Sequence, residues 1–109
     1  MKRVCVIGGS GFLGSHVADA LSAAGHHVRI YDHKASAWLR DGQEMIIGDL
    51  MDVASLEAAV KGSDIVYNFA ALADLNQALD KPIETVKINV LGNAHVLEAC
   101  RLNGVKRFL

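Results

Sequence analysis

Four glycines and one carboxylate are the residues whose types and spacing could do chemistry. The stretch Gly8-Gly-Ser-Gly-Phe-Leu-Gly14 fits G-x-G-x-x-G from Gly9 and G-x-x-G-x-x-G from Gly8. Between a strand and a helix, such glycines allow a tight turn, a close approach of backbone N–H groups to a pyrophosphate, and close helix–strand packing. The helix N-terminus adds unpaired donors and a partial positive charge. The loop therefore predicts a dinucleotide site, the alternative being a glycine-rich turn without a ligand.

Asp32 supplies the second half of this fingerprint. It ends the second predicted strand, at about the 20-residue spacing at which an acidic residue accepts hydrogen bonds from an adenosine ribose. The same charge would repel a 2′-phosphate, so the sequence favours NAD over NADP. The neighbouring His33 and Lys34 act against this preference, because a cation near the ribose tolerates the phosphate. A Walker A loop is excluded, since no Gly-Lys-Ser/Thr follows the glycines.

The elements that must position these residues alternate between strand and helix. The apolar, β-rich runs that predict strands are residues 4–7, 28–31, 45–47, 65–69 and the opening of a fifth strand at 108–109. Helix-length connections between such strands imply parallel pairing through right-handed crossovers. The fold class predicted is α/β, a Rossmann-type doubly wound parallel sheet of order 3-2-1-4-5, with the chain ending as strand 5 begins.

Three helices are predicted between the strands. The first follows the glycine loop and ends at Gly25, and the second spans residues 52–60 with Asp52 as its N-cap. The third is long, with Pro82 in its first turn and Gly104 at its end. One face of this helix is traced by Ile83, Val86, Val90, Ala94, Leu97 and Arg101.

Composition narrows the function classes. The 109 residues are 51% hydrophobic and 21% charged, which suits one packed domain or part of a larger one. A net charge of −1 without a Lys/Arg cluster argues against nucleic acid. No apolar run reaches the roughly 18 residues of a membrane span, and the first residues do not resemble a signal peptide. The five histidines show no metal-ligand spacing. Cys5 and Cys100 are expected to be buried thiols in a reducing cytoplasm, with a disulfide as the alternative.

Four motifs in order give a family resemblance over nearly the whole chain. They are Gly8-Gly-Ser-Gly-Phe-Leu-Gly14, Gly48-Asp-Leu50, Asn68-Phe-Ala-Ala71 and Ile88-Asn-Val-Leu-Gly92. Together they resemble the extended short-chain dehydrogenase/reductases, and within these the NAD-dependent sugar-nucleotide epimerases and dehydratases. One departure is Asn68, which stands where this family commonly has histidine. We expect that change to be tolerated.

The resemblance implies roles for individual residues. Asp49 and Leu50 would bracket the adenine, Phe69 to Ala71 would line the cofactor, and Asn89 would match the asparagine behind the active site. Without the resemblance, Asp49 could be a turn residue and Asn89 an ordinary helix position. The cofactor site predicted on this basis comprises Gly8, Gly11, Phe12, Leu13, Gly14, Asp32, His33, Asp49, Leu50, Phe69, Ala70, Ala71 and Asn89.

The family's catalytic Tyr-x-x-x-Lys pair is not found in this sequence. Tyr31 has its nearest lysine one residue too close, at Lys34, and Tyr67 has Ala71 at the matching position. Asp74 is a candidate base, but a solvated loop carboxylate is the favoured interpretation. We therefore expect no catalytic residue here. Residues 1–109 would be the N-terminal NAD-binding part of a longer enzyme, inactive alone, with the catalytic and substrate-binding part beyond it.

Two alternatives remain beside this hypothesis. One is a non-catalytic dinucleotide-binding sensor or scaffold, because a fold alone does not determine function. The other is an extended short-chain reductase that acts on a non-sugar substrate, such as a steroid. The expected partners are NAD, a sugar nucleotide or other small molecule in the longer protein, and a second copy in a homodimer.

Overall fold

Five parallel strands form one sheet in the computed structural model, which describes residues 1–72 and 74–109. The strands are β1 (Arg3–Ile7), β2 (His27–Asp32), β3 (Glu44–Ile47), β4 (Ile65–Asn68) and β5 (Arg107–Phe108). Their order is β3-β2-β1-β4-β5, and all four adjacent pairs are parallel. The predicted fold class and strand order are therefore confirmed. Each strand differs from its predicted range by one residue at one end or at both; β2, for example, spans His27–Asp32, and β4 ends before Phe69.

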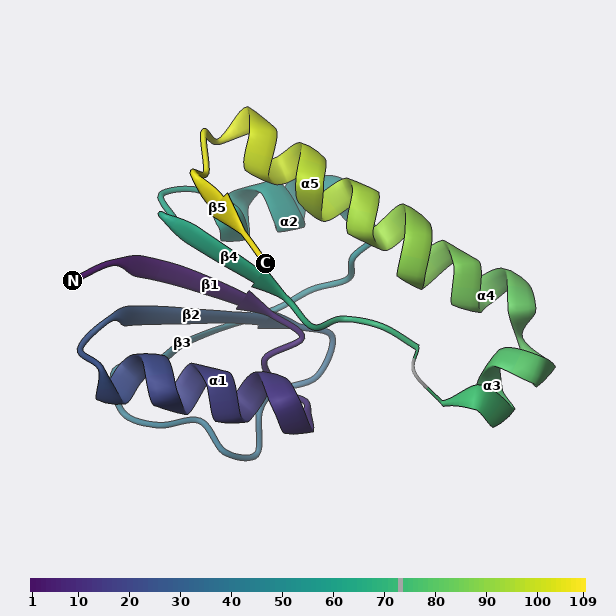
Figure 1. Ribbon diagram of the computed structural model, residues 1–109, viewed down its shortest axis with the longest axis horizontal. Coiled ribbons are helices and arrows are strands. Elements are labelled where there is room, and N and C mark those ends of the chain that lie inside the picture. Colours follow the sequence, from purple (N-terminus) through teal and green to yellow (C-terminus); the bar gives the residue numbers. More distant parts are fainter. Residues whose placement is uncertain (73) are drawn as a thin grey trace.

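Helices cover both faces of the sheet (Figure 1). Helix α1 (Phe12–Ala23) lies on one face, while α2 (Val53–Val60) and α5 (Asn93–Leu102) lie on the other. Alternate residues of β1 point to opposite sides, so Val4 and Val6 pack in the α1 core and Cys5 and Ile7 in the α2–α5 core. Burial on both faces explains why β1 reads as a continuous apolar run.

The helix ends follow the capping residues in the sequence. Gly25 has φ +90°, and His26 N–H donates to the Leu21 carbonyl at 3.1 Å, which closes α1 in a Schellman motif. Asp52 caps α2 by accepting a hydrogen bond from the Ser55 amide at 3.2 Å. The predicted helix ends are confirmed at both places.

The long third helix departs from the prediction in its regularity. It runs through α4 (Pro82–Val86), a π-helical segment η1 (Lys87–Gly92) and α5, and a short helix α3 (Leu75–Asp80) precedes it. Helix α3 has no buried residue, so no core-facing pattern marks it in the sequence. Asp74 is the N-cap of α3 and accepts from the Asn76 amide at 2.9 Å, so it is not simply a loop residue.

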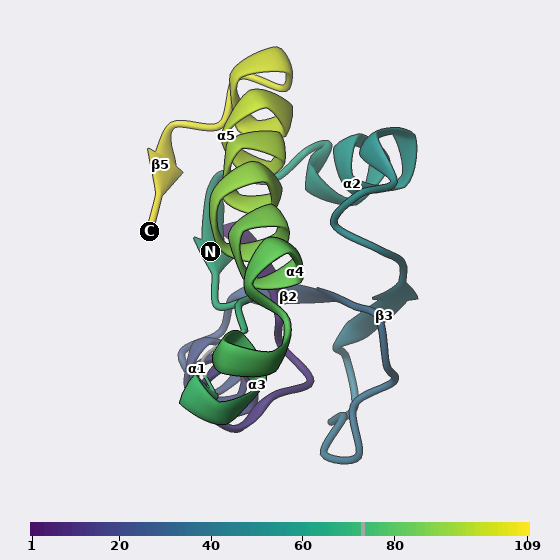
Figure 2. The ribbon, with the colours of Figure 1, turned by 90° about the vertical axis from the view of Figure 1, so that its right-hand side faces the viewer.

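The apolar stripe of the long helix points away from the sheet. Ile83, Val86, Val90 and Leu97 are exposed, whereas the helix packs on the sheet and α2 through Val96, Ala99 and Cys100. Figure 2, which looks onto the carboxyl edge of the sheet, shows the long helix beside α2 and opposite α1. The helix therefore has two apolar faces, and its periodicity identifies the outer one. Cys5 and Cys100 are buried free thiols, so the disulfide alternative is wrong.

Candidate cofactor-binding site

A cavity of about 530 Å³ lies along the carboxyl edge of the sheet. Residues that follow or end four strands line this cavity. They are the glycine loop after β1, Asp32 at the end of β2, Asp49 after β3 and Phe69 after β4. From β1 the chain connects to β2 on one side, and β4 lies on the other side, so the strand order reverses at β1. Doubly wound sheets bind ligands at the carboxyl edge beside such a reversal. The predicted site residues that line the cavity are Gly8, Gly11, Asp32, His33, Asp49, Leu50, Phe69, Ala70 and Ala71.

Three of the four loop glycines are required by the protein's own packing. Gly8 has φ +79°, and a Cβ there would lie 2.6 Å from the Ala70 nitrogen. A Cβ at Gly9 would lie 2.7 Å from Ile30 Cγ2, and one at Gly14 would overlap the Gly8 carbonyl. These glycines set the turn and bring α1 close to the loop.

Gly11 is different from its neighbours. It is the N-cap of α1 with φ −81° and ψ 179°, a conformation open to any residue. A Cβ at Gly11 would meet one described atom within 4 Å, the Gly8 oxygen at an ordinary 3.5 Å. Neither backbone conformation nor packing within the described chain requires glycine there. What a side chain at Gly11 would fill is space beside the cavity.

The first turn of α1 offers backbone donors next to Gly11. The amides of Phe12, Leu13 and Gly14 donate to no described residue, and Gly11 provides no capping side chain. The side chains of Phe12 and Leu13 are exposed and do not line the cavity, and Gly14 is buried against the loop. These three residues can therefore reach a ligand through their N–H groups only.

Asp32 ties the glycine loop to the end of β2. Its Oδ2 accepts from the Ser10 amide at 3.0 Å, and its Oδ1 accepts from the His33 amide at 2.7 Å. His33 Nδ1 lies 2.9 Å from the same Oδ1. Each carboxylate oxygen can accept more than one hydrogen bond, so Asp32 keeps acceptor capacity toward the cavity.

The segments after β3 and β4 form the rest of the wall. Asp49 closes its own turn, since its Oδ1 accepts from the Met51 amide at 2.9 Å. Asn68 shapes the next segment, because its Oδ1 accepts from the Ala70 amide at 3.1 Å and its Nδ2 donates to Asn93 Oδ1 at 2.9 Å. Because Ala70 and Ala71 have small side chains, a ligand in the cavity can approach the backbone of this segment closely.

Asn89 holds the chain after β4 and lies outside the cavity lining. Its Oδ1 accepts from the Leu72 amide at 2.8 Å, and its Nδ2 donates to the Leu72 carbonyl at 3.0 Å. This two-point contact fixes Leu72 against the π-helical segment. A direct contact of Asn89 with a cofactor stays a prediction.

Sequence reasoning missed part of the wall. The additional lining residues are Ile7, Tyr31, Gly48, Met51, Leu72, Glu84, Lys87 and Ile88. Tyr31 reads as a core residue, and Gly48 as part of a motif with no contact assigned to it. Glu84, Lys87 and Ile88 belong to the helical run that continues beyond the sheet edge. Their place beside the cavity depends on the chain path after β4, for which the sequence carries no signal.

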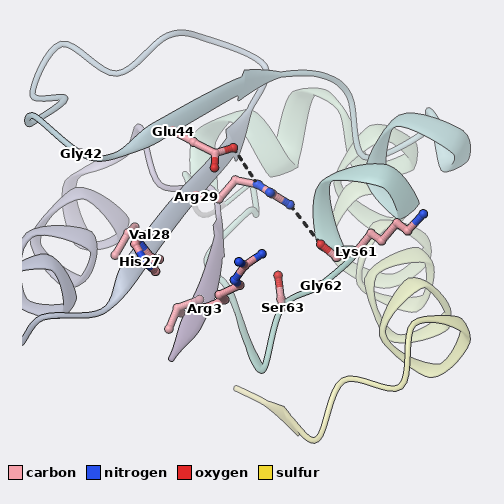
Figure 3. A pocket seen from close by; sticks show the side chains of 10 residues that line it. Arg3, His27, Val28, Arg29, Gly42, Glu44, Lys61, Gly62 and Ser63 are labelled. Atoms are coloured by element: carbon pink, nitrogen blue, oxygen red, sulfur yellow. Dashed lines mark hydrogen bonds and ion pairs between the residues drawn. The ribbon is translucent and has the colours of Figure 1, made fainter. Parts of the chain in front are cut away.

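A second cavity, of about 190 Å³, lies at the opposite, amino edge of the sheet (Figure 3). Its central residue, Arg29, pairs with Glu44 at 3.1 Å and donates to the Ala59 and Lys61 carbonyls at 2.8 and 3.1 Å. Arg29 therefore closes the end of α2 and anchors β3, so we assign this cavity a structural role. Among the described residues, no three potential metal ligands gather, and no helix is long and apolar enough to span a membrane.

The sheet order, the glycine loop and the cavity at the carboxyl edge define a Rossmann-type domain of the dinucleotide-binding class. Residues 4–109 match the NAD dependent epimerase/dehydratase family. This chain belongs to that family, whose cofactor is NAD.

The relatives of this chain are named for several different substrates. A UDP-N-acetyl-alpha-D-glucosaminuronate decarboxylase of Bacillus cytotoxicus is 33% identical over 100% of this chain and 36% of its own length. The sterol-4-alpha-carboxylate 3-dehydrogenase (decarboxylating) of Bos taurus is 32% identical over 99% of this chain and 29% of its own. The UDP-glucose 4-epimerase of Thermus thermophilus, solved with NAD, superimposes with a TM-score of 0.90 at 33% identity, covering 97% of this chain and 36% of that one. The chain thus spans about a third of the length of these relatives.

Proposed function

We propose that this chain binds NAD in the carboxyl-edge cavity, with the pyrophosphate against the glycine loop. Gly11 carries the proposal, because nothing in the described protein requires glycine there and a bound phosphate group would. The three free amides at the start of α1 lie beside it and suit an anion.

The remaining roles follow from the chemistry of each residue. Asp32 would accept hydrogen bonds from the adenosine ribose, with His33 beside it. Asp49 and Leu50 would bracket the adenine, and Phe69, Ala70 and Ala71 would lie against the nicotinamide half. Asn89 would support this wall through Leu72. When bound, the dinucleotide would supply a two-electron acceptor and donor.

Calorimetric titration tests this assignment. The chain is expected to bind one NAD and to bind NADP more weakly, because the Asp32 carboxylate repels a 2′-phosphate. Equal or reversed affinities would contradict the role given to Asp32. Absence of NAD binding would contradict the proposal as a whole.

For the whole protein, we propose an NAD-dependent epimerase or dehydratase acting on a sugar nucleotide. The support is the family and the UDP- and dTDP-sugar enzymes among the relatives. In this proposal, residues 1–109 form the NAD-binding part of a longer enzyme, and the groups that transfer protons lie outside it. We place the enzyme in the cytoplasm, a compartment that suits the free thiols of Cys5 and Cys100 in this part of it.

The chain alone is expected to be inactive. Tyr31 is buried and neither tyrosine has a lysine four residues on, while Asp74 is occupied as the cap of α3. Incubation with NAD and a panel of UDP-, GDP- and dTDP-sugars, followed by chromatography, should show no product. Turnover abolished by Gly11→Val would reveal a catalytic residue within the chain.

A sterol or steroid substrate is a second candidate, favoured by relatives such as the bovine sterol dehydrogenase. Assaying the longer protein with NAD and both substrate classes separates the two. A non-catalytic NAD-binding module is the third, and it predicts NAD binding without turnover of either class by the longer protein.

We also propose a homodimer formed through the outer apolar stripe of the long helix. Ile83, Val90 and Leu97 are 83%, 64% and 47% exposed along it. Sedimentation should show a dimer that Val90→Lys dissociates. A monomeric wild-type chain would contradict the proposal.

A further inference from the structure

The turn after β3 accepts hydrogen bonds from two side chains, Tyr31 and His95, to which the proposed function assigns no role. The Tyr31 hydroxyl donates to the Asp49 carbonyl at 2.7 Å. His95 Nδ1 lies 2.9 Å from the Leu50 carbonyl oxygen. Because a carbonyl oxygen only accepts, the His95 ring donates through Nδ1. Two consecutive carbonyls of the turn are thus fixed, one from β2 and one from α5.

Two glycines provide the room for this arrangement. A Cβ at Gly48 would overlap the Tyr31 hydroxyl, and a Cβ at Gly92 would lie 2.9 Å from Leu50 Cδ1. Tyr31 can therefore reach under the turn, and Leu50 can pack against the long helix. The turn also closes on itself, since the Asp52 amide donates to the Asp49 carbonyl at 3.1 Å. The position of the Asp49–Leu50 segment is therefore fixed by contacts with β2 and with the long helix.

Tyr31 is suited to act as a permanent donor. It is 1% exposed, and burial, together with the Asp52 and Asp49 carboxylates, raises the pKa of its phenol. The hydroxyl therefore keeps its proton across the neutral range. Since an unpaired buried hydroxyl is costly, the contact with the Asp49 carbonyl favours one position of the turn over others.

We infer that Tyr31 and His95 are positioning residues for the dinucleotide, holding the Asp49–Leu50 turn in the conformation that receives its adenine end. The inference rests on the proposed function, which assigns that turn to the adenine. Removing the Tyr31 hydroxyl would leave the Asp49 carbonyl with the Asp52 amide as its one described donor, and removing His95 would take the described donor from the Leu50 carbonyl. Either loss would lower the population of the competent conformation. The apparent affinity falls in proportion to that population.

Titration of the full chain with NAD and with ADP-ribose tests the inference. Tyr31→Phe and His95→Leu should each weaken both ligands about two- to tenfold, the change that corresponds to one hydrogen bond. His95→Asn should restore most of the affinity, because its amide nitrogen can occupy the place of Nδ1 as a donor. Tyr67→Phe and His27→Leu are the matched controls, since neither side chain contacts the turn, and they should bind as the wild type does.

A second measurement without ligand keeps the test independent of folding defects. Amide hydrogen exchange at Met51 and Asp52 should accelerate in Tyr31→Phe and His95→Leu, while exchange in β1 and β4 stays unchanged. Unchanged affinity in both variants beside a wild type that binds NAD, or unchanged exchange at the turn, would overturn the inference alone. A wild type that binds neither ligand would overturn the proposed function and this inference with it.

Discussion

Gly8 and Gly11 lie three residues apart in one loop and are glycine for different reasons. Gly8 has a positive φ and touches the backbone of Phe69 and Ala70, so the fold itself requires it. Gly11 meets no such demand within the described chain. The sequence motif treats the two alike, and only the three-dimensional packing separates a structural glycine from one that leaves room for a ligand.

This contrast predicts opposite outcomes for two alanine variants. Gly11→Ala should lower NAD affinity about 5- to 150-fold, since a methyl group forced into an occupied site costs about 1–3 kcal/mol. Its unfolding free energy should change by less than about 1 kcal/mol. Gly8→Ala should lose about 1–3 kcal/mol of stability, because it combines a left-handed backbone with a close contact. Calorimetry and urea unfolding measure the two quantities. Equal effects of both variants on stability would contradict the distinction.

Asp32 predicts the choice between the two nicotinamide dinucleotides. Asp32→Asn should narrow the preference for NAD over NADP about tenfold or more, because it removes a charge that attracts the ribose hydroxyls and repels a phosphate. Asp41→Asn makes the same charge change on an exposed loop and should leave the preference as it is. Parallel titrations with NAD and NADP provide the ratio. A preference that survives Asp32→Asn would assign the discrimination to another residue.

At the scale of elements, local sequence signals predict some features of the fold, and others depend on long-range packing. Strand runs, Asp52 and the terminal glycines Gly25 and Gly104 are local, and each predicted boundary lies within a residue or two of the structure. The π-helical segment and α3 have no comparable signal, because α3 buries no residue and the π-helical segment contacts the chain after β4 through Asn89. For the same reason, the cavity contacts of Glu84, Lys87 and Ile88 could not be predicted.

The contact between Asn89 and Leu72 ties the π-helical segment to the chain after β4. Asn89→Ala removes both hydrogen bonds and should lower the unfolding free energy by about 1 kcal/mol, a modest loss because Asn89 is exposed to water. Asn76→Ala, on the exposed helix α3, is a comparison that should have little effect. Urea unfolding of both variants is the measurement. Equal stability of the two variants would show that the bridge adds nothing.

At the scale of the whole molecule, the buried thiols of the core should make the free energy of unfolding fall as the pH becomes alkaline. Burial raises the pKa of the Cys5 thiol from 9.0 to about 12 and also raises that of Cys100. The folded state keeps its protons while the unfolded chain loses them, so the stability present below pH 9 is lost progressively as pH rises toward 12. Cys5→Ala should make this fall shallower in urea unfolding at stepped pH. An unchanged slope would contradict the assignment to Cys5.

The central claim is that a dinucleotide lies across the carboxyl edge with its phosphates on the first turn of α1. The most direct test is a titration of the isotopically labelled chain with NAD, followed by amide chemical shifts. Saturable shifts are expected at Phe12, Leu13 and Gly14 and at the Asp49–Leu50 turn, with little change around Arg29 at the amino edge. Shifts centred on the amino-edge cavity, or none at saturating NAD, would contradict the account.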